Sequence, residues 1–281
     1  MPLGANKVAL FAASAGGFEA TGGTVTTDGD YTIHTFTSSG DFVVSGSVEV
    51  EYLVVAGGGG GGTGDGKNGG GGAGGYRTGT GFTITSQTYA ITVGAGGAQG
   101  GTGSDSVFSS ITSSGGGYGG ATNNGSGGAG GSGGGAANQS NSYGAGNSGS
   151  YSPVEGYRGA VGQWNAMDGV GNYRYFGGGG GGSSEYGGTF NESPAGQAAP
   201  YNSGPKRDAG GDGTSNSISG SAVTYAAGGS ATGWIPHHGW AEIGYSLNTD
   251  DNTGDGSGGN VSHNARTGGG SGIVIIKYAT P

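Results

Sequence analysis

The sequence contains no cysteine, so neither a disulfide framework nor thiolate chemistry is available to it. Charged residues make up only 10% of the chain, and the 18 acidic residues outnumber the 9 basic ones. A net charge of −9 argues against nucleic-acid binding, which depends on a basic surface, and is typical of a soluble component that avoids self-association. No run approaches the roughly 18 consecutive apolar residues of a membrane-spanning helix, so membrane insertion is not expected.

Proline is also scarce, with 7 residues, whereas glycine accounts for 78 of the 281. Collagen is excluded, because it needs a glycine at every third position, and here the glycines come in runs such as residues 57–62 and 177–182. Ordering glycine costs more backbone entropy than ordering any other residue, and a dense network of backbone hydrogen bonds is needed to offset that cost. The runs therefore predict bundled polyglycine-II helices, whose amide and carbonyl groups point outward toward neighbouring segments.

Between the glycine runs, alternating and β-branched segments predict strands. These strands are expected at residues 31–36, 41–44, 48–55, 106–111, 221–225 and 272–278. Residues 82–85 and 89–93 are expected to form a hairpin closed by residues 86–88. No segment has a helical pattern, since glycine and β-branched residues are poor helix formers. The predicted fold class is all-β: a β-sandwich closed by the N- and C-terminal strands, with a polyglycine-II bundle, long ordered loops and essentially no α-helix.

Residues 1–30 are expected to form an N-terminal arm and linker, ahead of a glycine-rich domain over residues 31–281. The apolar residues 8–15 follow Lys7 and end in small residues, as in a short signal peptide. The stretch is at the short end for such a peptide, and we expect an assembly arm instead. Its contact residues would be Val8, Leu10 and Phe11.

Several phrases of the sequence resemble a family of glycine-rich structural proteins of bacteriophages and marine viruses. They are YTIHTFTSSG at residues 31–40, YLVVA and six glycines at residues 52–62, GGAGGYRT at residues 71–78, VTYA at residues 223–226, and GGSGIVIIKY at residues 269–278. In its glycine-rich character the chain is also similar to the tail-fibre-tip adhesins of T4-like phages. In those proteins polyglycine-II bundles carry loops that contact the host receptor, so this second likeness is one of architecture.

The resemblance implies a virion structural protein, a tail fibre or receptor-binding adhesin on the virion surface, without enzymatic activity or cofactor. It would be a homo-oligomer that joins other virion proteins through its N-terminal arm. The host partner would be a surface glycan or an outer-membrane protein. The alternative is a capsid-surface fibre or decoration protein, or the repeating subunit of a filament. A glycan depolymerase is the enzymatic competitor, with carboxylates at Glu155, Glu185, Glu192 and Glu242 to choose from.

Large aromatic and polar residues gather in three segments, residues 151–176, 185–208 and 234–255. Aromatic side chains give a large contact area at low entropic cost and stack well on sugar faces. The expected receptor contacts in these segments are Trp164, Tyr173, Arg174, Tyr175, Tyr186, Tyr201, Trp234, His237, His238, Trp240 and Tyr245.

The remaining motifs have simpler explanations. A phosphate-binding glycine loop must open a helix, and no helix is expected here. Residues 100–108 match the calcium β-roll repeat once, but that motif binds calcium only in tandem copies, so Asp105 is expected to form a turn. Asp250, Asp251, Asn252 and Asp255 could hold a hard cation, yet a solvated acidic turn fits their spacing better. No metal site is therefore predicted.

Overall fold

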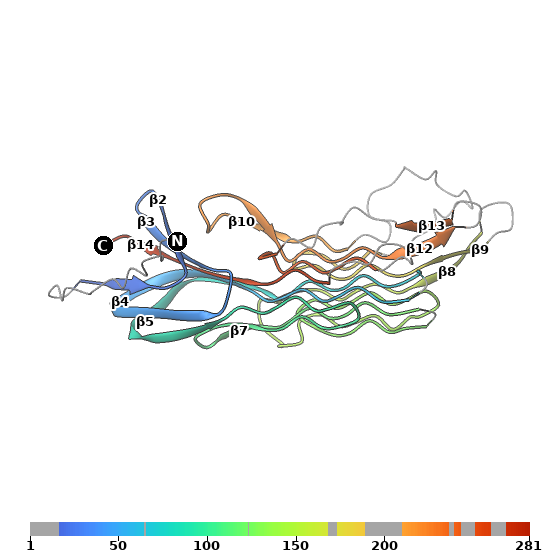
Figure 1. The fold of residues 1–281 in the computed structure, drawn as a ribbon, viewed down its shortest axis with the longest axis horizontal. Coiled ribbons are helices and arrows are strands. Elements are labelled where there is room, and N and C mark those ends of the chain that lie inside the picture. Colours follow the sequence, from blue (N-terminus) through green and yellow to red (C-terminus); the bar gives the residue numbers. More distant parts are fainter. Residues whose placement is uncertain are drawn as a thin grey trace, which may run out of the picture.

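The computed structural model describes residues 17–64, 66–122, 124–167, 173–188, 210–235, 239–242, 251–259 and 268–281. These residues form an elongated molecule with a large sheet at one end and a smaller sheet at the other, joined by a bundle of extended glycine-rich segments (Figure 1). They contain no helix, and so no helix able to cross a membrane. The prediction of an all-β fold is confirmed for this part of the chain.

The large sheet is antiparallel and open, with the strand order β2-β3-β14-β4-β5-β6-β7 and with β1 paired to β4. Its strands are β1 (Glu19–Thr21), β2 (Thr24–Asp28), β3 (Tyr31–Phe36), β4 (Gly40–Val55), β5 (Tyr76–Thr92), β6 (Ser106–Phe108), β7 (Ile111–Ser113) and β14 (Ile273–Ala279). The first two lie within residues 1–30, where the sequence predicts an arm and linker. The C-terminal strand β14 lies between β3 and β4, so strands from the N-terminal and C-terminal parts of the chain are neighbours in this sheet.

Both faces of the sheet are buried where β14 pairs with the end of β4, which explains the continuous apolar runs at residues 53–55 and 273–276. Alternate residues of β14 belong to different clusters: Val274 and Ile276 pack with the aromatic core of Phe42 and Phe108, whereas Ile275 packs with Leu53 on the other face. The aromatic core includes several edge-to-face ring pairs, such as Phe42 with Phe108 at 6.3 Å between centroids.

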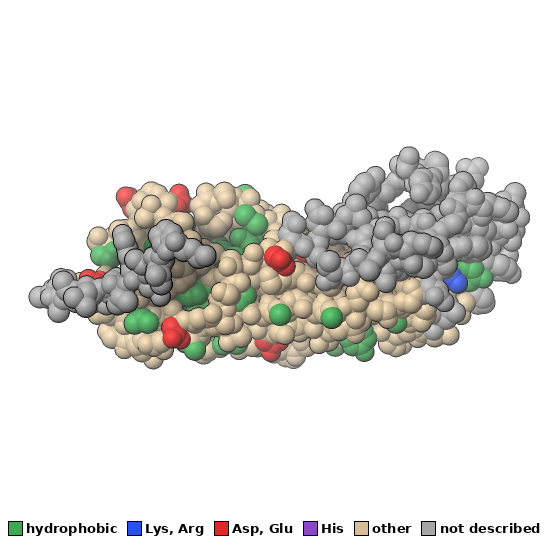
Figure 2. All heavy atoms as spheres, viewed as in Figure 1, with side chains coloured by type: hydrophobic (Ala, Val, Ile, Leu, Met, Phe, Trp, Pro, Cys, Tyr) green, Lys and Arg blue, Asp and Glu red, His purple; other side chains and the backbone are tan. Residues whose placement is uncertain are grey.

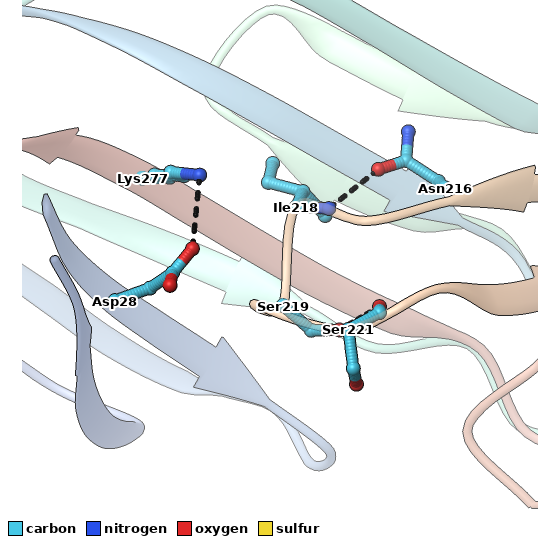
Figure 3. Close-up of polar contacts among 6 residues, drawn as sticks. All are labelled: Asp28, Asn216, Ile218, Ser219, Ser221 and Lys277. Carbon is cyan, nitrogen blue, oxygen red and sulfur yellow. Dashed lines mark hydrogen bonds and ion pairs between the residues drawn. The ribbon is translucent and has the colours of Figure 1, made fainter.

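The second face is covered by a hairpin of β10 (Thr214–Asn216) and β11 (Val223–Tyr225), which inserts Ile218 into the core. Asn216 Oδ1 accepts a hydrogen bond from the amide of Ile218 at 2.7 Å and so shapes the hairpin's connection (Figure 3). Beside it, Lys277 of β14 pairs with Asp28 of β2 at 3.6 Å (Figure 3). The hairpin thus completes the packing around the C-terminal strand.

Two predictions about the strands are wrong. The predicted hairpin at residues 82–93 is part of one continuous strand, β5, that pairs with β4 along its length. In place of the expected turn, β5 continues, and β4 has a β-bulge opposite it. In this bulge Gly46 has a φ of 90°, and its amide donates to Ser86 Oγ at 2.7 Å. Conversely, the strand expected at residues 106–111 is a hairpin of β6 and β7, because Ser109 takes a left-handed conformation with a φ of 56°.

The glycine-rich segments form the predicted polyglycine-II bundle. Within residues 69–75, the amides at positions 69, 72 and 75 donate to residues 114–120. The amides at positions 70 and 73 donate to residues 178–181, and those at positions 71 and 74 donate to residues 254–257. The segment therefore has three residues per turn and a different neighbouring segment on each of its three sides, which is the geometry of a polyglycine-II helix. We call this hydrogen-bonded bundle the lattice; it is held together by backbone groups where an ordinary domain uses side chains.

Acidic side chains supply further acceptors at the borders of the lattice. Asp105 Oδ1 accepts from the amide of Gly115 at 2.8 Å, and Asp255 Oδ1 accepts from the amide of Ala227 at 2.8 Å. Glu155 is fully buried, and its Oε2 accepts from the amide of Ser114 at 2.8 Å. These carboxylates give backbone amide donors the acceptor that buried donors require. Asp105 does not lie in the turn that the sequence predicts; it directly precedes β6, and its carboxylate is part of the lattice border.

A buried histidine joins the two ends of the chain within the large sheet. His34 is completely buried, with Nδ1 2.8 Å from the carbonyl oxygen of Gly22 and Nε2 2.9 Å from the hydroxyl of Tyr278. Burial lowers the pKa of His34 below its ordinary value of 6.5, and the smaller opposing influence is the hydrogen bond to Gly22. The folded protein therefore holds this imidazole neutral at a pH where the unfolded chain binds a proton.

This difference predicts that acid weakens the fold. Since the unfolded state binds more protons between the lowered pKa of His34 and about 6.5, the free energy of unfolding falls as the pH drops through this window and is unaffected above it. Melting temperatures of the wild type are expected to decrease from pH 7.5 to pH 5. The variant His34→Phe is expected to be less stable at every pH but to show a shallower decrease. Parallel pH profiles for the two proteins would contradict this role.

Candidate binding site

The small sheet at the far end of the lattice has the strand order β13-β12-β9-β8 (Figure 1). Its strands are β8 (Gln163–Met167), β9 (Tyr173–Phe176), β12 (Thr232–Ile235) and β13 (Gly239–Glu242). The chain enters β8 from a lattice segment and leaves β9 into the run at residues 177–182, whose amides continue the hydrogen bonding. The sheet is therefore an extension of the lattice, and its strands are held in place by the glycine segments beneath it.

The register of this sheet brings together residues that are far apart in sequence. Trp164 pairs with Tyr175, Tyr175 pairs with Trp234, and Trp234 pairs with Trp240. All three tryptophans of the chain therefore lie with Tyr175 in a single row across four strands. The row is defined by this backbone register, in which each residue is the cross-strand partner of the next. We call these four residues the aromatic row.

Tyr175 is the member of the aromatic row with described side-chain contacts. Lys67 Nζ lies 4.6 Å from the centroid of its ring, a cation–π contact that joins the row to the lattice turn below. Lys67 has a φ of 70° in this turn, and the neighbouring Asn68 is fully buried, with Oδ1 accepting from the amide of Thr122 at 2.8 Å. The base of the row is thus fixed by a hydrogen-bonded turn.

The other predicted contacts fall into three groups. Tyr173 and Arg174 lie in β9, where they pair with Met167 and Ala166. Tyr186 lies in none of the strands of the small sheet, and its ring contacts Tyr157 and Arg158 on the flank of the lattice. The rest of the predicted contacts and the arm residues lie outside the described residues: Tyr201, His237, His238, Tyr245, Val8, Leu10 and Phe11.

The flank around Tyr186 carries a cluster that the sequence analysis missed. The guanidinium carbon of Arg158 lies over two rings, 4.5 Å from the centroid of Tyr143 and 4.9 Å from that of Tyr186. Tyr157 meets Tyr186 edge to face, at 4.9 Å between centroids. Tyr186 is 52% exposed and Tyr143 39% exposed, so the cluster faces solvent. The adjacent Tyr157 and Arg158, large residues inside a glycine segment, were the available signal.

Elsewhere the visible surface is poor in charge and in large side chains. On the face drawn in Figure 2, acidic and basic side chains are isolated among neutral atoms. Within the described ranges, no three His, Asp or Glu residues gather as a metal site would require. Of the carboxylates considered for catalysis, the buried Glu155 binds backbone amides, and Glu192 lies outside the described residues. Two groups of residues with recognition chemistry are the aromatic row, defined by strand register, and the tyrosine–arginine cluster, whose Tyr143 and Tyr186 are exposed.

Comparison with known proteins identifies the family of this chain. The sequence matches the family model described as a glycine-rich domain over residues 35–279, which is most of the chain. No curated protein matches the sequence.

Proposed function

Since the chain belongs to the glycine-rich domain family, we propose a function that depends on its glycine lattice: a virion surface protein of a bacteriophage, acting as a tail-fibre adhesin. It binds the host through the aromatic row and has no enzymatic activity. The single observation that carries the proposal is the register that gathers Trp164, Trp234 and Trp240 with Tyr175 in one row. Tryptophan and tyrosine dominate the energetics of recognition surfaces, and their rings stack on sugar faces.

The difference between the two ends of the molecule supports this role. The large sheet holds the C-terminal strand and the strands that follow the expected arm, whereas the small sheet lies at the opposite end (Figure 1). An adhesin needs an attachment end and a contact end kept apart by a rigid body. A hydrogen-bonded lattice provides such a body, because its segments cannot bend independently without breaking backbone hydrogen bonds. The proposed ligand is a surface glycan or an outer-membrane protein of the host.

Binding to bacterial cells tests the proposal. Fluorescently labelled protein is expected to bind at least one strain of a bacterial panel, and the double variant Trp234→Ala, Trp240→Ala to bind that strain about 700-fold more weakly. The estimate takes about 2 kcal/mol for each aromatic anchor, where 1.4 kcal/mol is tenfold. The variant Tyr118→Ala, which removes an exposed ring outside the row, is the matched control. Binding to no strain, or unchanged binding by the double variant, would refute the aromatic row as the contact surface.

One observation favours the second candidate, a decoration protein or filament subunit. Strand β2 is at the border of the large sheet, and all five of its residues are exposed. An exposed edge strand has unpaired backbone groups that can pair with a neighbouring chain. The number of copies per particle separates the candidates, since a decoration or filament protein is present in hundreds of copies and a tail-tip adhesin in few.

A further inference from the structure

Arg158 is an exposed positive charge in a chain where acidic residues outnumber basic ones two to one. Lys277 pairs with Asp28, but Arg158 contacts two tyrosine rings and a carbonyl oxygen, and none of the described carboxylates is its partner. Stacking on a ring leaves the charge of a guanidinium in place. Within the described part of the chain, the tyrosine–arginine cluster therefore offers an external anion a cation that has no carboxylate partner.

The hydrogen bonding of Arg158 defines the shape of that anion. Its Nη1 donates to the carbonyl oxygen of Gly159 at 3.1 Å, which occupies one side of the guanidinium. None of the described residues accepts a hydrogen bond from the edge formed by Nε and Nη2, which carries two parallel N–H donors. A carboxylate is planar and accepts two such bonds side by side, which gives both strength and orientation.

The lattice holds the cluster in advance of binding. Three segments meet here, because the amide of Gly159 donates to Gly144 at 3.0 Å and the amide of Gly187 donates to Arg158 at 3.1 Å. The residues that project from these segments are Tyr143, Arg158 and Tyr186. With backbone and guanidinium already positioned, a ligand does not need to order flexible loops, which lowers the entropic cost of association.

From these observations we infer that Tyr143, Arg158 and Tyr186 form a binding site for a saccharide that carries a carboxylate group. The guanidinium edge binds the carboxylate, and the exposed tyrosines contact the hydroxyl groups and the apolar face of the sugar ring. The site lies on the flank of the lattice and is distinct from the aromatic row. The inference rests on the proposed function only in taking a surface glycan as the class of ligand.

Calorimetric titration of the whole chain with polygalacturonate tests the site, with the fully methyl-esterified polymer as the uncharged counterpart. The wild type is expected to bind the acid and not the ester, and to bind more weakly at high salt. Both Arg158→Gln and Arg158→Lys are expected to weaken binding at least tenfold, since an ammonium group lacks the planar fork. The control Arg77→Gln removes the same charge from a ring-stacked arginine, 4.0 Å over Tyr151, and is expected to leave binding unchanged.

Four results overturn the assignment: no binding by the wild type, equal binding of the ester, wild-type affinity in Arg158→Gln, or binding of polyglycerol phosphate in place of polygalacturonate. Melting temperatures of the Arg158 variants should match the wild type, because this side chain is exposed. The titration uses no cells. Failure of the carboxylate site is therefore scored separately from failure of the aromatic row in cell binding.

Discussion

Replacing Gly59 with alanine is expected to destabilise the protein by at least about 3 kcal/mol, although the change adds one carbon atom. A Cβ at this position would fall on the carbonyl oxygen of Gly117, 2.6 Å from its carbon and 2.9 Å from the oxygen of Gly116. The neighbouring segment would have to move, and this would break hydrogen bonds such as that from the amide of Gly59 to Gly72, at 2.8 Å. Overpacking costs about 1–3 kcal/mol, and each buried group left without a partner costs about 1–3 kcal/mol more.

The matched control for this substitution is Gly40→Ala. Gly40 begins β4, is exposed, and has no atom within 4 Å of an added Cβ. Its substitution is expected to change stability by less than about 0.5 kcal/mol, as for most surface positions. Thermal or denaturant unfolding of the two variants measures the difference. Equal and small effects at both positions would show that the glycine runs tolerate side chains, which is incompatible with a packed lattice.

Local physical chemistry explains why the lattice could be predicted from sequence. The runs at residues 57–62 and 177–182 have no side chains to bury, so only backbone hydrogen bonds to neighbours can offset their ordering entropy. The bulge at Gly46 was missed because the Ser86 side chain that stabilises it belongs to another strand. Taken by themselves, residues 86–88 have the composition of a turn, and this is why the sequence predicts a turn there.

The neighbours of each glycine segment could not be predicted, because one glycine run has the same chemistry as another. The aromatic row depends on those neighbours. Trp164, Trp234 and Trp240 were each proposed as contacts, but they are spread over more than 70 residues of sequence. Their alignment follows from strand register, which the surrounding lattice determines. The same reasoning applies to Arg158, whose partners Tyr143 and Tyr186 come from other segments.

The variant Phe108→Ala is expected to lower the free energy of unfolding by about 3–5 kcal/mol, the usual cost of removing a buried phenyl ring. Phe108 is fully buried in the aromatic core. Its ring lies 5.6 Å from that of Phe82 and 5.8 Å from that of Tyr89, between centroids. It also anchors β6, a strand of three residues that lies between β5 and β7. The control Val25→Ala, at a position 52% exposed on β2, is expected to cost less than about 0.5 kcal/mol.

The way in which Phe108→Ala unfolds also reveals whether the core and the lattice form one cooperative unit. Val54 and Val55 are fully buried in the core, and the run at residues 57–62 continues from them without a break. Displacing β4 would therefore pull the first lattice segment away from its hydrogen-bond partners. We expect a single unfolding transition, with faster amide exchange in residues 57–62 and 69–75 as well as in β6. Two separate transitions, or lattice exchange at the wild-type rate, would mean that the lattice is stable without the aromatic core.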